Sequence, residues 1–495
     1  MAVSLAKYGE YRWLEMIPGG LIWGSFVLAV VLSFVAPLWA VIFIILFDTY
    51  WMFRVLYFVF YVTVSWRRYK RLSRKDWAQD VERIPGWRRI HHLVFLPMYG
   101  EDISIIRTTI KALRDCAYPN DRLLVVLAGE GREEKRFRLI QHQIEKEFRG
   151  VFGALWFTLH PDGLPDEIPG KGSNLNWAAG EVARHLATTL SDVPPEDLVV
   201  TSFDVDTVAP KHYFSYLTYL YLTVPHPTRA SYQPLTFFSN NIWHAKAPVR
   251  VGAFGTTFWL MTELARPDRL WTFSSHSMSW RMLLDVGFWQ KNIVSEDSRI
   301  FLQGLIHYDG DYRVVPMYIG VHMDAVTGST YMESLKNLYI QQRRWAWGVE
   351  NLMEMYKGFR AHPAMPFRTK MRYFWNQMEG MYTWATAPIL IFLMGWLPLF
   401  IAGQNPSAVV QAAPATLEFI MRIATLGVFV SAIYSMTLLP GRPVGRGVFS
   451  WLVMLVQWAL LPITFVIFGA FPSIDAQTRL MLGHYLGFHV TKKAR

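Results

Sequence analysis

The spacing of apolar and polar positions marks out several long apolar stretches. Residues 21–66 are almost continuously apolar, and further apolar stretches cover residues 383–402, 419–439 and 448–471. A membrane-spanning helix needs about 20 apolar residues at a rise of about 1.5 Å per residue. The first stretch therefore predicts two spans, broken near Pro37, and the later stretches predict about three more.

Between these stretches, residues 67–330 have the pattern of a soluble α/β domain. Short apolar runs predict buried strands at 92–96, 123–127 and 198–203, and amphipathic periodicity predicts helices at 103–114 and 133–148. Strand–helix alternation of this kind gives a mostly parallel sheet. In such sheets ligands bind where the carboxyl ends of the strands meet the loops, so functional residues are expected there.

The segment after this domain is amphipathic rather than spanning. Apolar and basic residues alternate at helical spacing over residues 331–381, which predicts helices in the headgroup plane. The predicted organisation is two N-terminal transmembrane helices in 1–66, a cytoplasmic α/β domain in 67–330, interfacial helices in 331–381, about three C-terminal transmembrane helices in 382–472, and a basic amphipathic tail in 473–495.

The number of spans conflicts with the charge of the tail. Two spans return the chain to the cytoplasm, and three more would leave the basic residues of 473–495 outside, against the positive-inside rule. Either one C-terminal segment is re-entrant, or residues 367–402 hold more membrane structure. The charge of the tail favours a cytoplasmic C-terminus.

Composition supports an integral membrane protein. Hydrophobic residues make up 52% of the chain and aromatic residues 16%, and much of the net charge of +11 lies beside apolar runs. Basic residues in these positions favour an anionic inner leaflet, so we expect a multi-pass protein of the cell (inner) membrane. Its expected partner is the lipid bilayer, and we expect no nucleic acid to bind. The one cysteine, Cys116, excludes an internal disulfide.

Three charged residues in apolar stretches leave another class of function open. Asp48, Arg54 and Arg422 are costly in hydrocarbon and must face protein or water. A channel or transporter would use them for conduction; the alternative is that they pair with neighbouring helices or lie near the membrane interface.

The strongest local motif is a pair of aspartates after an apolar run, Asp204 and Asp206. Residues two apart share one face of a strand, so both carboxylates are expected to address one site. Hard oxygens of this kind suit Mg²⁺ or Mn²⁺ on a diphosphate. Taken alone, such a pair is also common at surface strand ends.

Two further motifs follow. The run Ser295-Glu296-Asp297 supplies carboxylates for a general base, although acidic residues also favour helix N-termini. The run Gln341-Gln342-Arg343-Arg344-Trp345 offers arginine donors for phosphate and a flat aromatic face for a sugar ring. A basic interfacial helix would have a similar composition.

The order of these motifs resembles the family 2 glycosyltransferases, in particular the membrane synthases of the cellulose, chitin and hyaluronan type. The resemblance covers about residues 94–348. Two more segments match, the run Leu96-Pro97-Met98-Tyr99-Gly100-Glu101 and the run Pro169-Gly170-Lys171-Gly172-Ser173-Asn174. The second is not a phosphate-binding P-loop, because glycine follows Lys171 where serine or threonine is required.

The resemblance implies a Rossmann-like α/β domain of GT-A type inserted between transmembrane helices. It implies a nucleotide-sugar site at Pro97, Tyr99, Glu101, Glu130, Lys171, Asp204 and Arg344, a metal ligand at Asp206, a catalytic base at Asp297, and acceptor binding by Gln341 and Trp345. The second strand departs from the family, whose aspartates hold uracil, because Ala128-Gly129-Glu130 follows Leu127 here. Glu130 is expected to substitute in a site for a UDP-sugar.

The implied reaction is an inverting hexosyl transfer at the cytoplasmic membrane face, with Mg²⁺ or Mn²⁺ as cofactor. The expected product is a growing polysaccharide, and its translocation by the same chain is an optional further step. The alternative is a non-processive transfer to a lipid or lipid-linked acceptor, which a small number of spans favours.

Overall fold

The computed structural model describes residues 11–401 and 407–487, and in this part of the chain it contains one seven-stranded sheet. The strands are β1 His91–Pro97, β2 Leu123–Glu130, β3 Ala154–His160, β4 Leu198–Ser202, β5 Ala230–Phe237, β6 Ser277–Ser279 and β7 Arg313–His322. Their spatial order is β3-β2-β1-β4-β6-β5-β7. The pairs β1/β2, β2/β3, β1/β4 and β5/β7 are parallel, whereas β6 is antiparallel to both neighbours. The prediction of a mostly parallel sheet is therefore confirmed.

Helices cover both faces of the sheet. They are α3 Trp77–Glu82, α4 Ile103–Arg114, α5 Glu134–Phe148, α6 Lys171–Thr189, α7 Tyr213–Thr223, α8 Ala247–Leu264, α9 Trp280–Val286 and α10 Glu296–His307. Alternate side chains of β1 point to opposite faces. Leu93 and Phe95 join the core that contains α6, and Val94 and Leu96 join the core that contains α4, α5 and α7.

The predicted elements lie close to those observed. Helix α4 has the predicted bounds, because Asp102 caps its first turn by accepting the Ser104 N–H and five buried residues follow at helical spacing. Strand β2 extends to Glu130 rather than 127, and β4 ends at Ser202 rather than 203.

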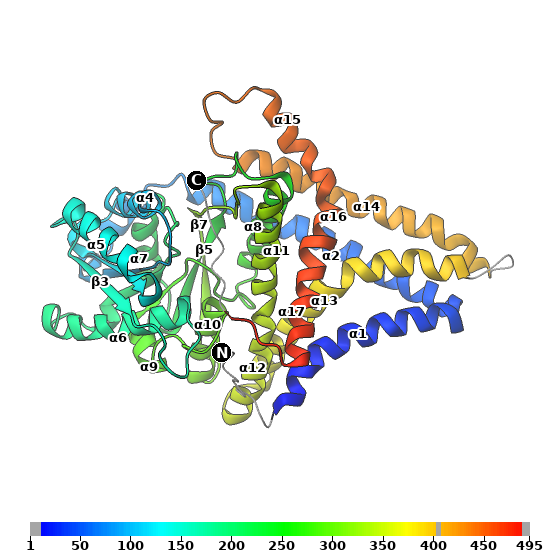
Figure 1. The fold of residues 1–495 in the computed structure, drawn as a ribbon, viewed down its shortest axis with the longest axis horizontal. Coiled ribbons are helices and arrows are strands. Elements are labelled where there is room, and N and C mark those ends of the chain that lie inside the picture. Colours follow the sequence, from blue (N-terminus) through cyan, green and yellow to red (C-terminus); the bar gives the residue numbers. More distant parts are fainter. Residues whose placement is uncertain (1–10, 402–406, 488–495) are drawn as a thin grey trace.

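Long apolar helices project away from the sheet domain (Figure 1). In the described part of the chain, five helical segments are long and apolar enough to cross a membrane: α1 Arg12–Val35, α2 Pro37–Leu72, α13 Phe367–Ile401, α14 Ala408–Leu438 and the segment Phe449–Leu482. The last consists of α15 Phe449–Val456, α16 Leu461–Phe465 and α17 Phe471–Leu482, joined by short 3-10 and π turns. The predicted break near Pro37 falls between α1 and α2.

Two helices link the sheet domain to this bundle, α11 Tyr331–Ala346 and α12 Asn351–Ala361. The predicted boundary between interfacial and spanning segments, at 381–382, lies inside α13, which is one continuous helix. Gly380, at the predicted boundary, and Pro388 and Pro398 beyond it do not end the helix, so the change from amphipathic to apolar sequence occurs along a single helix. Residues 1–10, 402–406 and 488–495 of the predicted N-terminal, spanning and tail segments lie outside the described residues.

The charged residues of the apolar stretches make local contacts. Arg54 lies 3.3 Å from the Glu379 carboxylate of α13, and Arg422 pairs with Glu418 one turn away on α14 at 2.5 Å. Asp48 is buried on α2. Arg54 is thus paired with a neighbouring helix, whereas the Arg422 pair lies within one helix and is exposed.

Candidate active site

The aspartates Asp204 and Asp206 follow β4 but face different surroundings. The strand ends at Ser202, and a turn closed by the Thr207 N–H on the Asp204 carbonyl, at 2.8 Å, carries both residues. Asp204 is partly exposed, and its Oδ2 accepts from the Ser274 hydroxyl at 3.0 Å. Asp206 is buried, and its Oδ2 accepts from the Asp324 N–H at 2.9 Å. The expectation of a shared strand face is wrong here, because strand alternation stops before Asp204.

Lys171 is the centre of a charge cluster. It is the first residue of α6, it is 9% exposed, and its ammonium lies 2.7 Å from Asp204 Oδ1 and 2.8 Å from Asp297 Oδ1. Glu296 Oε1 is 3.6 Å away. Burial lowers the pKa of the Lys171 ammonium, but Asp204, Asp297 and Glu296 raise it by more, so the net pKa lies above the ordinary value. One permanently charged ammonium therefore joins three carboxylates from two distant segments of the chain.

A glycine permits this close approach. A Cβ on Gly172 would lie 2.9 Å from the Gln290 carbonyl oxygen and 3.2 Å from Glu296 Cβ. The first turn of α6 consequently packs directly on the loop that leads into α10, which brings Lys171 to Asp297.

The carboxylates at the start of α10 are held from several sides. The Asp297 carbonyl accepts from the Thr272 hydroxyl at 2.6 Å, and the Ser295 hydroxyl donates to Glu350 Oε1 at 2.9 Å. Burial and Asp297 raise the pKa of Glu296, whereas Lys171 and Arg344 lower it. The Arg344 guanidinium is thus one of the two positive charges that act on Glu296.

A histidine also lies beside Asp297. His276 Nδ1 is 3.8 Å from Asp297 Oδ1 and 2.8 Å from the Phe273 carbonyl, so Nδ1 carries the hydrogen. Burial lowers the pKa of His276 and favours the neutral ring. Its buried Nε2 has no hydrogen-bond partner among the described residues.

The predicted nucleoside-binding residues gather at the ends of β1 and β2. Glu101 Oε2 accepts from the Tyr99 N–H at 2.6 Å, just beyond Pro97 at the end of β1. Glu130 ends β2 and is ion-paired with Arg132, whose guanidinium carbon lies 4.3 Å above the centre of the Tyr99 ring. Burial raises the pKa of Glu130, and Arg132 lowers it.

The residues of the Gln341–Trp345 motif on α11 face three different parts of the structure. Successive residues point about 100° apart on a helix. Arg343 pairs with Asp475 of α17 at 2.9 Å, Arg344 acts on Glu296, and Gln341 and Trp345 line a small cavity against α8. The rest of the lining is Phe238, Val249, Gly252, Ala253, Thr256, Ala325, Val326, Leu338 and Gln342.

The two glutamines of this cavity are largely buried. Gln341 is 7% and Gln342 8% exposed. Neither amide is among the fully buried polar groups that lack a partner in the described chain, so both amides remain accessible beside the cavity.

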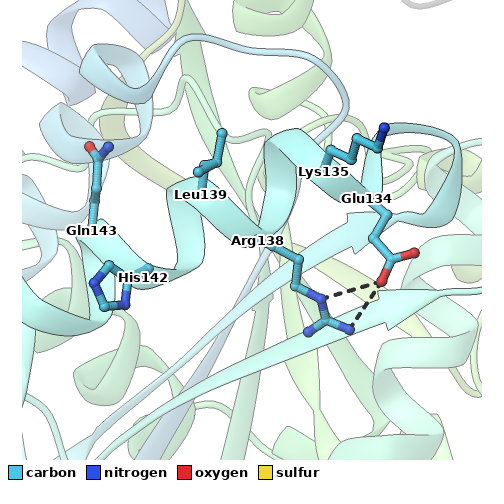
Figure 2. Close-up of a pocket in the computed structure, with 6 residues that line it drawn as sticks. All are labelled: Glu134, Lys135, Arg138, Leu139, His142 and Gln143. Carbon is cyan, nitrogen blue, oxygen red and sulfur yellow. Dashed lines mark hydrogen bonds and ion pairs between the residues drawn. The ribbon is translucent and has the colours of Figure 1, made fainter.

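A second hollow lies on the outer surface of the domain. Figure 2 shows six side chains of α5, from Glu134 to Gln143, along one open helix face. It contains the Glu134–Arg138 ion pair at 3.4 Å and none of the predicted site residues.

The structure thus brings together Lys171, Asp204, Asp297 and Arg344, with separate groups at Tyr99/Glu101/Glu130 and at Gln341/Trp345. Sequence reasoning missed Arg132, His276, Gln342 and Glu350. Arg132 and Gln342 adjoin predicted motifs, whereas nothing in the local pattern signals His276 or Glu350, whose contacts are made by residues distant in sequence.

The carboxylates suit a divalent cation only in part. In the described chain, no group of three or more His, Cys, Asp or Glu side chains is arranged around a common point. Mg²⁺ is commonly held by one or two carboxylates, with water and substrate phosphate completing the shell. The hard oxygens of Asp204 and Asp206 fit that mode, in which the diphosphate supplies further ligands.

Comparison with known proteins gives weak likenesses. No protein-family model and no curated protein matches the chain. Among solved structures, mannosyltransferase PcManGT from Pyrobaculum calidifontis, in complex with GDP-Man and Mn²⁺, is 17% identical over 79% of this chain and 98% of its own, with a TM-score of 0.44. TarS 1–349 from S. aureus, in complex with UDP-GlcNAc, is 13% identical over 70% of this chain and 92% of its own, with a TM-score of 0.33. GalNAc-T7 with UDP, GalNAc and Mn²⁺ is 9% identical over 59% of this chain and 58% of its own, with a TM-score of 0.33. Likenesses of this strength do not by themselves assign a fold family or a reaction.

Proposed function

We propose that this chain is a membrane-embedded inverting glycosyltransferase with a GT-A-type catalytic domain, which transfers a hexosyl group from a nucleotide-diphosphate sugar to an acceptor hydroxyl. The observation that carries the proposal is the Lys171 ammonium between Asp204 and Asp297, at 2.7 and 2.8 Å. The ammonium joins Asp204, which follows β4 and would meet the donor, to Asp297, which would act as the base.

Donor binding uses three sets of residues. Tyr99, Glu101 and Glu130 would hold the base of a nucleotide, which we take to be a uridine nucleotide. Lys171 and Arg344 would neutralise the diphosphate as it departs. Asp206 would hold Mg²⁺ or Mn²⁺, which supplies further charge neutralisation on the diphosphate, and Asp204 would contact the nucleotide.

The chemical step needs one base. Asp297 would accept the proton of the acceptor hydroxyl as that oxygen attacks the anomeric carbon. The bond from the anomeric carbon to the diphosphate breaks, the electron pair leaves with the nucleotide diphosphate, and the configuration inverts. In the present arrangement the Asp297 carboxylate is bound to Lys171, so a diphosphate that draws the ammonium away would also release the base.

The acceptor side is proposed at Gln341 and Trp345 of α11, beside the small cavity against α8. Trp345 would stack on a sugar ring, and Gln341 would fix the orientation of that ring. A sugar acceptor supports a growing polysaccharide as product. A glycolipid acceptor is the alternative, favoured by the small number of membrane helices available to form a pore.

The test uses the full chain in lipid with a panel of radiolabelled nucleotide sugars and Mg²⁺ or Mn²⁺. We expect nucleotide release with one donor, and product size separates polymer from glycolipid. Asp297→Asn and Asp206→Ala should lower release by at least about 100-fold, as for loss of a positioned base. Asp121→Asn, an exposed aspartate, is the matched control and should retain wild-type activity. Unchanged release in both site variants would contradict the proposal.

A further inference from the structure

The C-terminal segment Phe449–Leu482 is long and apolar enough to cross a membrane, yet its contacts do not fit a spanning helix. We infer that it lies in the membrane plane, under the catalytic domain, as a lipid-facing support. The chain then crosses the bilayer four times, by α1, α2, α13 and α14.

The first observation is contact with the catalytic domain and then with α11, which follows it, along the whole segment. From its first turns to its last, the contacting pairs are Trp451–Trp243 with ring centres 5.3 Å apart, Gln457–Arg250 at 2.6 Å, Trp458–Phe258 with ring centres 5.9 Å apart, and Asp475–Arg343 at 2.9 Å, where Arg343 belongs to α11. Trp451 and Asp475 are 24 residues apart, which is about 36 Å along a helix. The hydrocarbon core is about 30 Å thick, so a spanning helix could not keep both positions on the catalytic side of the membrane.

The second observation is where the segment meets the other apolar helices. It crosses α1 at Trp23, whose indole donates to Thr478 at 3.0 Å, and α13 at Met381, whose carbonyl accepts from Gln477 at 2.9 Å. It crosses α14 near its end, where Trp458 donates to Ser435 at 2.9 Å. In Figure 1, α15, α16 and α17 run across the bundle beside the catalytic domain, while α1, α13 and α14 extend away from it.

The third observation is the composition of the opposite face. Its apolar side chains are between 40% and 74% exposed; they are Phe449, Leu452, Val453, Leu455, Val456, Ile463, Phe465, Ile467 and Phe471. A helix with one face bound to protein and an apolar face exposed suits the boundary between headgroups and acyl chains.

With four spans, the number of membrane crossings no longer conflicts with the positive charge of the C-terminal tail. The linker before the segment is on the catalytic side, because the Pro440 carbonyl accepts from the Trp243 indole at 3.1 Å. The described chain after the segment is on that side as well, because the Tyr485 ring lies 6.4 Å from that of Trp347. Both ends of the segment, and Arg442 and Arg446 of the linker, are then cytoplasmic, as the positive-inside rule requires.

Cysteine labelling tests the topology without any assay of catalysis. The native chain has one cysteine, Cys116, which is buried, so Cys116→Ala gives a clean background. Single cysteines replace exposed Val444 before the segment and His484 after it. Gln143 of α5 marks the catalytic side, and Ser407 before α14 marks the opposite side. Sealed vesicles of each orientation are treated with a membrane-impermeant maleimide.

We expect Val444→Cys, His484→Cys and Gln143→Cys to label from one side and Ser407→Cys from the other. Labelling of His484→Cys together with Ser407→Cys would overturn the inference. Arg442→Cys and Leu482→Cys serve as second sites on either side of the segment if the first variants do not fold.

Bilayer depth gives an independent measurement. Nitroxides on exposed Val453, Ile463 and Phe471 should show one shallow depth, about 5–10 Å into the boundary region. A spanning helix would place Ile463 near the bilayer centre and the other two near opposite surfaces, and that pattern would refute the inference. Both measurements stand whether or not the chain transfers sugar.

Discussion

Replacing Gly172 by alanine tests the packing that brings Lys171 to Asp297. The new Cβ would meet the Gln290 carbonyl oxygen at 2.9 Å and Glu296 Cβ at 3.2 Å. An ordinary contact begins near 3.4 Å, so the first turn of α6 and the loop before α10 must separate by roughly 0.5 Å. A backbone carbonyl cannot swing aside as a flexible side chain can, and overpacking of this kind costs about 1–3 kcal/mol.

The same displacement lengthens the contacts from Lys171 to Asp297, at present 2.8 Å. A misplacement of about 1 Å in an active site costs about 100-fold in rate, so half of it should lower kcat by roughly 10-fold. Nucleotide release from the active donor measures kcat, and thermal unfolding in detergent measures stability. Gly180→Ala is the matched control, because it lies on the same helix with no atom within 4 Å of its Cβ.

Gly180→Ala should retain full activity and gain up to about 1 kcal/mol from helix propensity. The reasoning is refuted if Gly172→Ala behaves like Gly180→Ala in both measurements. Loss of stability with an unchanged kcat would show that the contact packs the domain without placing Lys171.

Three other perturbations have defined outcomes. Glu350→Ala removes the acceptor of the Ser295 hydroxyl, so kcat should fall by about 10-fold while donor Kd, measured by calorimetry, stays within twofold; an equal loss of affinity would contradict a positioning role. Gly252→Ala narrows the cavity between α8 and α11, with its Cβ 3.4 Å from Leu338, and should raise acceptor KM several-fold, whereas Gly255→Ala, which has open space, should not. Equal KM values in the two variants would rule out this cavity as the acceptor site. Burial raises the pKa of Glu296 above that of an unfolded glutamate, so its protonated form favours the fold, and the free energy of unfolding should fall as pH rises from about 4.5 through the raised pKa. Glu296→Gln should flatten that part of the Tm profile, and a profile that keeps the wild-type slope would show that another group titrates.

Local pattern was sufficient for most elements of the catalytic domain. The bounds of α4 followed from an N-cap and helical spacing, and β1, β2 and β4 followed from short apolar runs. An N-cap, a helical spacing and an apolar run all depend on whether a position faces water or the core. Residues close in sequence share that environment within one element.

The sequence pattern was insufficient where the direction of a side chain decided its contacts. The two-residue spacing of Asp204 and Asp206 suggested one shared face, yet the strand ends at Ser202 and a turn sends the carboxylates to different surroundings. Glu350 contacts Ser295 across 55 residues, so no local signal could mark it.

The sequence by itself determined which segments are apolar, which form strands and helices, and which carboxylates and basic residues stand at their ends. Only the tertiary structure decided that Lys171 joins Asp204 to Asp297, that Gln341 and Trp345 of α11 line a cavity against α8, and that Phe449–Leu482 runs along the sheet domain and α11. The physical reason is the same in each case. Apolar length and charge show that a segment favours leaving water, but they do not say whether it crosses the bilayer or lies at its surface, whereas contacts between distant residues select the direction.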